Sequence, residues 1–328
     1  MPSQLNRFSA PGSNSVTSST PLSSSLARGF SKQSGRFQTI ARVAVGVALV
    51  CVTASTVASA FHTVSGSVRF AGFDLNIATS IATGLFLIAI AIRLYRIWRN
   101  PERMWFGSRV LAERTRSLVW RYAVAGEPFP LLDGVPAEQT DRAYQHELDG
   151  IAKEAESGSV LPLLPRNEPP KVFTEWMLHT RAGSLEDRRK TYAAQRIQGQ
   201  VDFYNNRAHQ NQQAATLTQW LLVLIELTGA LLAALNAANI VSLDLVGVVG
   251  TVAAGVTAWV QFNQFSALAN VYNGMVFRMT AYRERCESNA TIWTEERWAE
   301  FVSDVESTLA TENGAWQRIV QQGLTNSQ

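Results

Sequence analysis

The chain alternates between long apolar segments and polar segments. Four apolar windows, at residues 43–61, 75–92, 220–241 and 245–261, stand out. Each is close to the length of about 20 residues that a helix needs to cross a bilayer. They form two close pairs with a long polar segment between them. This pattern predicts an all-α integral membrane protein with two two-helix transmembrane hairpins and long cytoplasmic helical extensions.

The polar segments predict how the chain is divided. Residues 1–35 are rich in Ser and contain no Asp or Glu. We expect a disordered tail there, and a transit peptide is the alternative, which the lack of an amphipathic Arg face disfavours. A first two-helix module is predicted at 36–125. Residues 126–170 are rich in Pro and acids and predict a linker, with a short helix around 138–156.

Residues 171–328 contain no proline, which favours long uninterrupted helices. We therefore predict a second two-helix module at 171–318 and a flexible C-terminus at 319–328. Ser184 resembles a helix N-cap, because Glu186 and Asp187 follow in the first turn. From there one helix is expected to continue into the span at 220–241. A last amphipathic helix would contain Trp298.

Basic residues flank the predicted spans and indicate their orientation. Arg42 and Arg93 stand at the two ends of the first hairpin, whereas its turn contains Arg69 alone among Lys and Arg. The positive-inside rule then places both termini in the cytoplasm and the turns outside the cell membrane. Asp74, at the end of this turn, could cap the next helix or contribute to an acidic vestibule; we expect the cap.

The remaining composition narrows the function classes. The net charge is +3 and the pI about 9.0, and the cations at the membrane flanks account for both without nucleic acid. Two cysteines and four scattered histidines give no metal-ligand spacing. No nucleotide-loop or nucleophile motif occurs. We expect Glu295 and Glu296 to form a solvated helix start. The expectation is a protein without cofactor, metal or catalytic site.

One face of the third span carries the residues of greatest functional interest. Gln219, Glu226, Gly229 and Asn236 share that face, and Gly247 and Thr251 lie on a small-residue face of the fourth span. An ionisable group at membrane depth is costly and usually faces a bundle interior or a wet cavity. These residues are candidates for a polar seam that lines a pore in a homo-oligomer. The alternative is close helix packing through small residues.

Two segments resemble a known family. Residues 184–289 contain Tyr192-x-x-x-Arg196, then Tyr204, Arg207 and Ala208, before two close spans, and residues 114–122 contain Trp120-Arg121-Tyr122. This resembles the SLATT proteins, two-transmembrane effector domains associated with bacterial nucleotide-signalling systems, over residues 36–310 as two modules in tandem. The second half resembles a former domain-of-unknown-function family. The resemblance supplies no catalytic or ligand residues.

The resemblance implies a membrane effector that forms pores when a nucleotide-synthesis or nucleotide-sensing partner protein signals infection. The expected partners are thus the lipid bilayer, further copies of the chain and such a protein. The alternative is a membrane-anchored helical scaffold that binds cytoplasmic partners without conducting. A transporter is disfavoured, because substrate sites usually need broken helices and more polar groups within the membrane.

Overall fold

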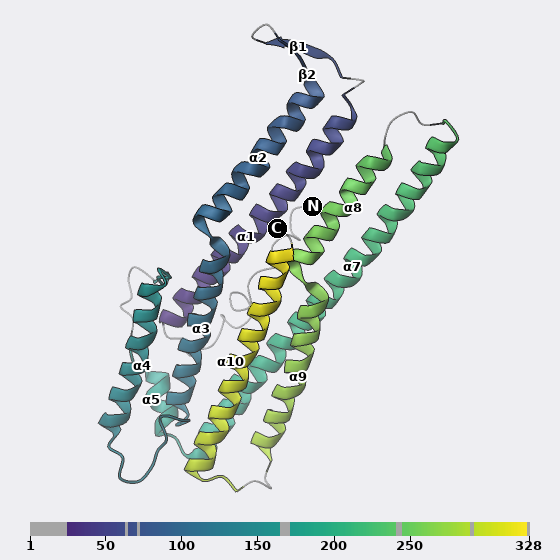
Figure 1. The fold of residues 1–328 in the computed structure, drawn as a ribbon. Helices are drawn as coiled ribbons and strands as arrows, with labels where there is room; N and C mark the ends of the chain where they lie inside the picture. Colours follow the sequence, from purple (N-terminus) through teal and green to yellow (C-terminus); the bar gives the residue numbers. More distant parts are fainter. Residues whose placement is uncertain are drawn as a thin grey trace. The chain divides into compact units, whose positions relative to one another are not determined.

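The computed structural model describes residues 25–62, 65–70, 73–164, 171–240, 245–288 and 292–326 (Figure 1). Most of these residues are helical, and the strands among them belong to one short hairpin. Four of the described helices are long and apolar enough to cross a membrane. The predicted apolar windows therefore form helices. The outer turn expected between the third and fourth windows lies at 241–244, outside the described residues.

The first helix begins earlier than the sequence predicted. α1 spans Ser25–Ala60 and thus includes part of the expected disordered tail, 1–35; residues 1–24 lie outside the described residues. Ala27 and Phe30 are almost completely buried, and Phe30 belongs to a core formed mainly by α3 and α4. Burial of these side chains against distant elements stabilises a helix that the local Ser-rich composition does not predict.

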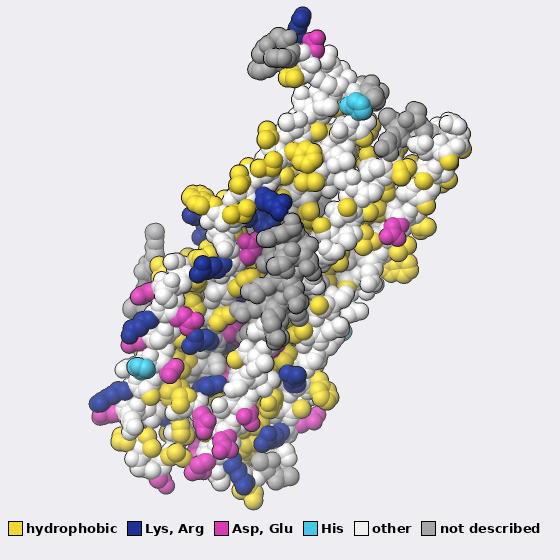
Figure 2. Space-filling model, viewed as in Figure 1, with side chains coloured by type: hydrophobic (Ala, Val, Ile, Leu, Met, Phe, Trp, Pro, Cys, Tyr) yellow, Lys and Arg dark blue, Asp and Glu magenta, His cyan; other side chains and the backbone are white. Residues whose placement is uncertain are grey.

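The chain divides into two compact units, and each is described by itself. The polar unit contains the described residues up to Thr39, with Glu102–His209 and Leu268–Arg318, and the apolar unit contains Ile40–Pro101, Gln210–Ala267 and the described residues from Ile319 on. In Figure 2, charged side chains of both signs gather on the polar unit, and hydrophobic ones cover much of the visible face of the apolar unit.

Four helical segments make up most of the apolar unit. They are the second part of α1, α2 (Ile77–Arg99), the second part of α7 (Gln198–Ala237) and α8 (Leu245–Asn263). Small side chains are buried on the first two of these segments, among them Cys51 and Ser55 on α1 and Ala78 and Ala82 on α2. Large apolar side chains remain exposed, as expected for helices that face lipid.

A short β-hairpin joins α1 to α2, where the sequence predicted only a polar turn. β1 (Ser67–Phe70) and β2 (Phe73–Asn76) pair antiparallel. Asn76, and not Asp74, caps α2, because its side-chain oxygen accepts a hydrogen bond from the Thr79 N–H at 3.2 Å. Asp74 lies opposite Arg69 in the strand pair and forms an exposed ion pair with it at 3.8 Å. The expected cap by Asp74 is therefore wrong.

The polar unit consists mainly of helices. Besides the first parts of α1 and α7, it contains α3 (Pro101–Ala123), α4 (Ala137–Ser157), α5 (Glu175–Ala182), α6 (Leu185–Thr191), the π-helical segment η2 (Tyr192–Ile197), most of α9 (Phe265–Glu287) and most of α10 (Glu295–Asn326). α10 is the amphipathic helix expected around Trp298.

The segment 126–170 takes part in the core of the polar unit. α4 forms where a short helix was predicted. Phe129 and Tyr144 are fully buried and pack with Tyr122 of α3 and Met177 of α5 in one hydrophobic cluster. The composition of this segment predicted a linker because prolines and acids dominate it. Its few aromatic side chains nevertheless bury a large apolar area, and this burial makes the segment part of the core.

The long helix expected from Ser184 onward is present, but it is not α-helical throughout. α6, η2 and α7 form one continuous helix over Leu185–Ala237, and the Ser184 hydroxyl caps it by accepting a hydrogen bond from the Asp187 N–H at 3.2 Å. Within it η2 has π-helical geometry. Such an insertion shifts side chains around the helix and is frequent at functional sites. Tyr192 and Arg196 of η2 are both buried.

Candidate functional sites in the apolar and polar units

Glu226 lies on an outward face of α7, inside the apolar window. The side chain is exposed, and no residue of the 18-residue window of this helix is buried. Within the described residues no hydrogen bond or ion pair engages its carboxylate. Leu224 and Leu227 beside it are also exposed. The apolar unit thus presents a carboxylate on a surface otherwise suited to lipid.

The other residues predicted to form the polar seam lie either on the exposed surface or against a neighbouring helix. Gln219 and Asn236 are exposed like Glu226, whereas Gly229 faces α8, because a Cβ at this glycine would lie 3.3 Å from Cγ1 of Val249. α7 and α8 therefore approach closely at Gly229, through a different residue of α8 from the expected ones.

On α8, the Thr251 hydroxyl donates a hydrogen bond to the Gly247 carbonyl of its own helix at 3.0 Å. A further close approach joins α8 to α1. A Cβ at Gly255 would lie 2.8 Å from the Thr53 hydroxyl oxygen, whereas one at Gly46 would make only an ordinary contact with the Trp259 ring, at 3.5 Å. Tight packing through small residues thus connects the first and second hairpins. A seam formed by Glu226 together with Gly247 and Thr251 stays a prediction.

The polar unit contains a buried ion pair at η2. Arg196 of η2 donates to both carboxylate oxygens of Glu306 on α10, at 2.9 and 2.7 Å. The Tyr192 hydroxyl donates to the same carboxylate at 2.9 Å. The exposed fraction is 3% for the Arg196 side chain and 0% for that of Glu306. Because each charge is matched and hydrogen-bonded, the pair can remain ionised away from water.

Further ionisable groups surround this pair. Burial alone would raise the pKa of Glu113, but the guanidinium groups of Arg116, Arg196 and Arg109 outweigh it and hold the pKa below its usual range. Burial has the opposite outcome at Glu312, where it raises the pKa despite Arg109 nearby and a hydrogen bond from the Tyr204 hydroxyl at 3.1 Å.

A second polar junction lies at the end of α3, where the Val124 carbonyl accepts two hydrogen bonds. One comes from Arg188 at 3.2 Å and the other from the indole N–H of Trp298 at 2.6 Å. Arg188 also forms an ion pair with Glu295 at 2.5 Å. The expectation of a merely solvated helix start is therefore wrong for Glu295. Its partner lies 107 positions away in the sequence, so no local sequence pattern indicates this ion pair.

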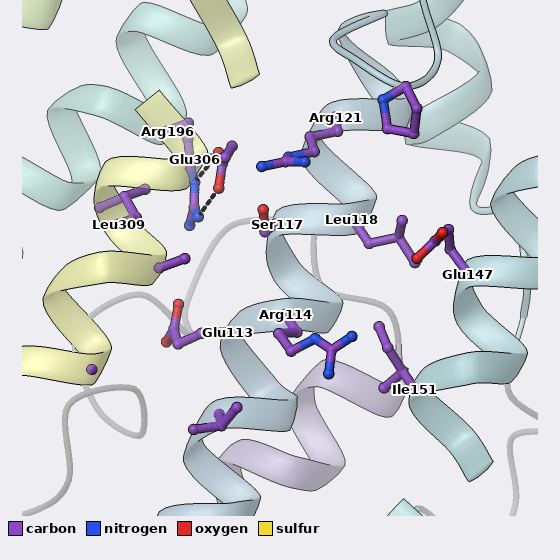
Figure 3. Close-up of a pocket in the computed structure, with 14 residues that line it drawn as sticks. Glu113, Arg114, Ser117, Leu118, Arg121, Glu147, Ile151, Arg196, Glu306 and Leu309 are labelled. Atoms are coloured by element: carbon purple, nitrogen blue, oxygen red, sulfur yellow. Dashed lines mark hydrogen bonds and ion pairs between the residues drawn. The ribbon is translucent and has the colours of Figure 1, made fainter. Parts of the chain in front are cut away.

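A cavity of about 520 Å³ lies in the polar unit between α3, α4, η2 and α10. Figure 3 shows its charged side chains: Arg121 extends from α3 toward α10, on the side of the Arg196–Glu306 pair, and Ser117 points into the same space. The rest of the wall is largely apolar and includes Leu118, Ile151 and Leu309. This volume lies within the range of small-molecule sites.

The sequence indicates only some residues of the Arg196–Glu306 pair and of the cavity. Tyr192 and Arg196 belong to the resemblance motif, although their buried partner Glu306 gives no local signal. Arg121 belongs to the Trp120-Arg121-Tyr122 motif, but this motif does not indicate that Arg121 lines a cavity. Among the described residues, no group of three His, Cys, Asp or Glu side chains is arranged to hold a metal ion.

Comparison with known protein families gives two matches in tandem. The family described as "SMODS and SLOG-associating 2TM effector domain 3" matches residues 31–189. The family described as "SMODS and SLOG-associating 2TM effector domain 1" matches residues 192–316. No curated protein and no solved structure matches the chain. The second match begins at Tyr192, the first residue of η2.

Proposed function

The chain belongs to the SLATT family, with two of its two-transmembrane effector domains in tandem, and from this premise we propose that it is an oligomeric effector that opens or perturbs the bilayer. It is a multi-pass membrane protein. The trigger would be a nucleotide-synthesis or nucleotide-sensing protein of a prokaryotic defence system. The basic flanks at Arg42 and Arg93 support cytoplasmic termini.

Glu226 is the observation that supports conduction. An exposed carboxylate within an apolar helical window would contact hydrocarbon in an isolated copy, at a cost of several kcal/mol. Association of several copies removes that cost if the carboxylates face a common aqueous lumen. A ring of carboxylates is a known arrangement in cation-conducting pores. We therefore place Glu226 at the lumen of a cation-conducting oligomer, with Gln219 and Asn236 on the same face.

The test is ion flux through liposomes that contain the full-length protein. Glu226→Leu should abolish cation conductance, and Glu226→Gln should retain the pore but reduce its cation preference. Asp74→Asn is the matched control, because it removes a carboxylate from the exposed hairpin and not from an apolar window. Unchanged conductance in Glu226→Leu would show that the carboxylate does not line the pathway.

The close contacts of α8 with α1 and α7 favour a second candidate, a dry scaffold. Gly229 and Gly255 allow these helices to pack tightly, which a non-conducting anchor would also need. In that case the polar unit would bind cytoplasmic partners. Liposomes that remain ion-tight at every protein density, in the presence of the activating partner, would favour the scaffold over the pore.

A further inference from the structure

The cavity in the polar unit is lined by charged side chains that the pore proposal does not use. Three guanidinium groups and three carboxylates are among its lining side chains. Arg196 is paired with Glu306, and Arg114 forms an ion pair with Glu154 of α4. Glu113 is paired with Arg116. The lining groups that remain are Arg121 and the exposed Glu147.

Arg121 differs from the other two lining arginines. Its Nε is buried and has no hydrogen-bond acceptor within the described part of the chain. Glu306, toward which Arg121 extends in Figure 3, already accepts three hydrogen bonds from Arg196 and Tyr192. A buried donor without an acceptor is unfavourable, because it has lost its hydrogen bonds to water without replacement. A planar guanidinium in this setting is suited to a bidentate oxyanion.

The other lining groups limit the charge and shape of that oxyanion. Glu147, which no ion pair neutralises within the described residues, would repel a polyphosphate, and the one unpaired guanidinium, that of Arg121, matches a single negative charge. Leu118, Ile151 and Leu309 provide apolar walls around the remaining volume. A ligand with an apolar body and a single carboxylate satisfies both conditions.

We propose that this cavity binds a small organic monocarboxylate, whose carboxylate pairs with Arg121 and whose apolar body fills the space between α3, α4 and α10. The Ser117 hydroxyl, which points into the same space (Figure 3), supplies a further donor. The walls come from both family matches, α3 and α4 from residues 31–189 and η2 and α10 from residues 192–316. Binding therefore stabilises the association of the two halves in the polar unit.

Cyclohexanecarboxylate is a suitable probe, and the measurement is thermal unfolding of the full-length protein in non-ionic detergent, followed by tryptophan fluorescence. The midpoint should rise with probe concentration, because a ligand that binds only the folded state stabilises it. Cyclohexylmethanol, which lacks the charge, and acetate, which lacks the apolar body, should each give a much smaller rise.

Two variants connect the effect to the cavity. Arg121→Gln should weaken the apparent affinity about tenfold or more, because it removes a charge-assisted pair. Arg142→Gln is the matched control, since it removes an exposed guanidinium from α4 of the same unit. Ala310→Phe should fill the cavity from α10 while leaving Arg121 in place, and it should also abolish the rise.

An equal rise in the wild type and in Arg121→Gln, or the absence of any rise up to the solubility limit of the probe, would overturn the proposal. A rise with acetate as large as with cyclohexanecarboxylate would do the same. Glu226→Leu should leave the effect unchanged, so this site and the proposed pore can fail separately.

Discussion

At the residue scale, Arg196 and Glu306 form an ion pair that is almost completely buried in the polar unit. Removing an ion from water costs several kcal/mol, and only good geometry with further hydrogen bonds offsets this cost. Here two hydrogen bonds from Arg196 and one from Tyr192 satisfy a carboxylate with no exposed surface. The intact pair therefore adds little net stability, whereas either charge left alone in this position would be strongly destabilising.

Breaking this pair from one side should therefore be costly. We expect Arg196→Met to destabilise the polar unit by about 3–5 kcal/mol, because Glu306 would stay buried without a countercharge. Arg196→Met combined with Glu306→Leu should recover most of this loss. Denaturant unfolding of the full-length protein in detergent, followed by tryptophan fluorescence, measures both effects.

The matched control for this cycle is Arg142→Met, since the Arg142 side chain is 80% exposed. Its loss should change the free energy of unfolding by less than about 1 kcal/mol. A cost below 1 kcal/mol for Arg196→Met as well would mean that water reaches Glu306.

Residue patterns in the sequence indicate only part of these sites. Glu226 is recognisable because a charge within an apolar window is unusual. Tyr192 and Arg196 are recognisable through a family motif. Glu306 and Glu295 are not, because their partners lie 110 and 107 positions away, and nothing local distinguishes a buried Glu from a solvated one.

At the element scale, the helices agree with the sequence because hydrophobic length and the absence of proline act locally. α4 and α10 follow the same rule. The elements that were not predicted depend on distant contacts or on small local differences. The start of α1 needs a core for Phe30, and β1 and β2 are only four residues each. The π-helical geometry of η2 differs from an α-helix by one inserted residue, for which composition gives no signal.

The cap of α2 allows a direct comparison of two neighbouring residues. Asn76→Ala should destabilise the start of this helix by about 1 kcal/mol, because the Thr79 N–H loses its acceptor and the Asn76 amide also donates to the His62 carbonyl at 2.8 Å. Asp74→Ala should cost less than about 0.5 kcal/mol, because its ion pair with Arg69 is exposed.

Hydrogen–deuterium exchange at the first-turn amides of α2 measures this difference. Faster exchange in Asn76→Ala than in Asp74→Ala is the expected order. The reverse order would restore Asp74 as the residue that fixes the helix start.

At the scale of the whole molecule, the two family matches and the two compact units divide the chain differently. Residues 31–189 contribute α3 and α4 to the polar unit and α2 to the apolar unit, and residues 192–316 also contribute to both. The sequence predicted two successive modules joined by a linker at 126–170. It could not show that this segment contacts the second half, where the Glu127 N–H donates to the Ala299 carbonyl at 3.3 Å.

Gly126 lies at this junction between the halves and tests its importance. A Cβ at this position would lie 2.7 Å from Cβ of Val302 on α10 and closer still to its Cγ1. We expect Gly126→Ala to destabilise the polar unit by about 1–3 kcal/mol through overpacking. Gly150→Ala on α4 is the matched control, because a Cβ there meets nothing within 4 Å.

The control should be neutral or stabilising by up to about 1 kcal/mol, since alanine favours a helix interior over glycine. Thermal unfolding in detergent compares the two variants. Equal midpoints would show that α10 can move away from Gly126 at little cost.

The inserted residue of η2 affects the direction in which the side chains that follow it point around the helix axis. Each residue of an α-helix turns the chain by about 100° around the axis. If η2 adopted α-helical geometry by expelling its extra residue, the side chains of α7 from Gln198 to His209 would turn around the helix axis by about that angle relative to α6. Arg196 and Tyr192, held by Glu306, fix the present setting. Three buried side chains of the polar unit therefore hold the orientation of the first part of α7 around the axis of its own helix.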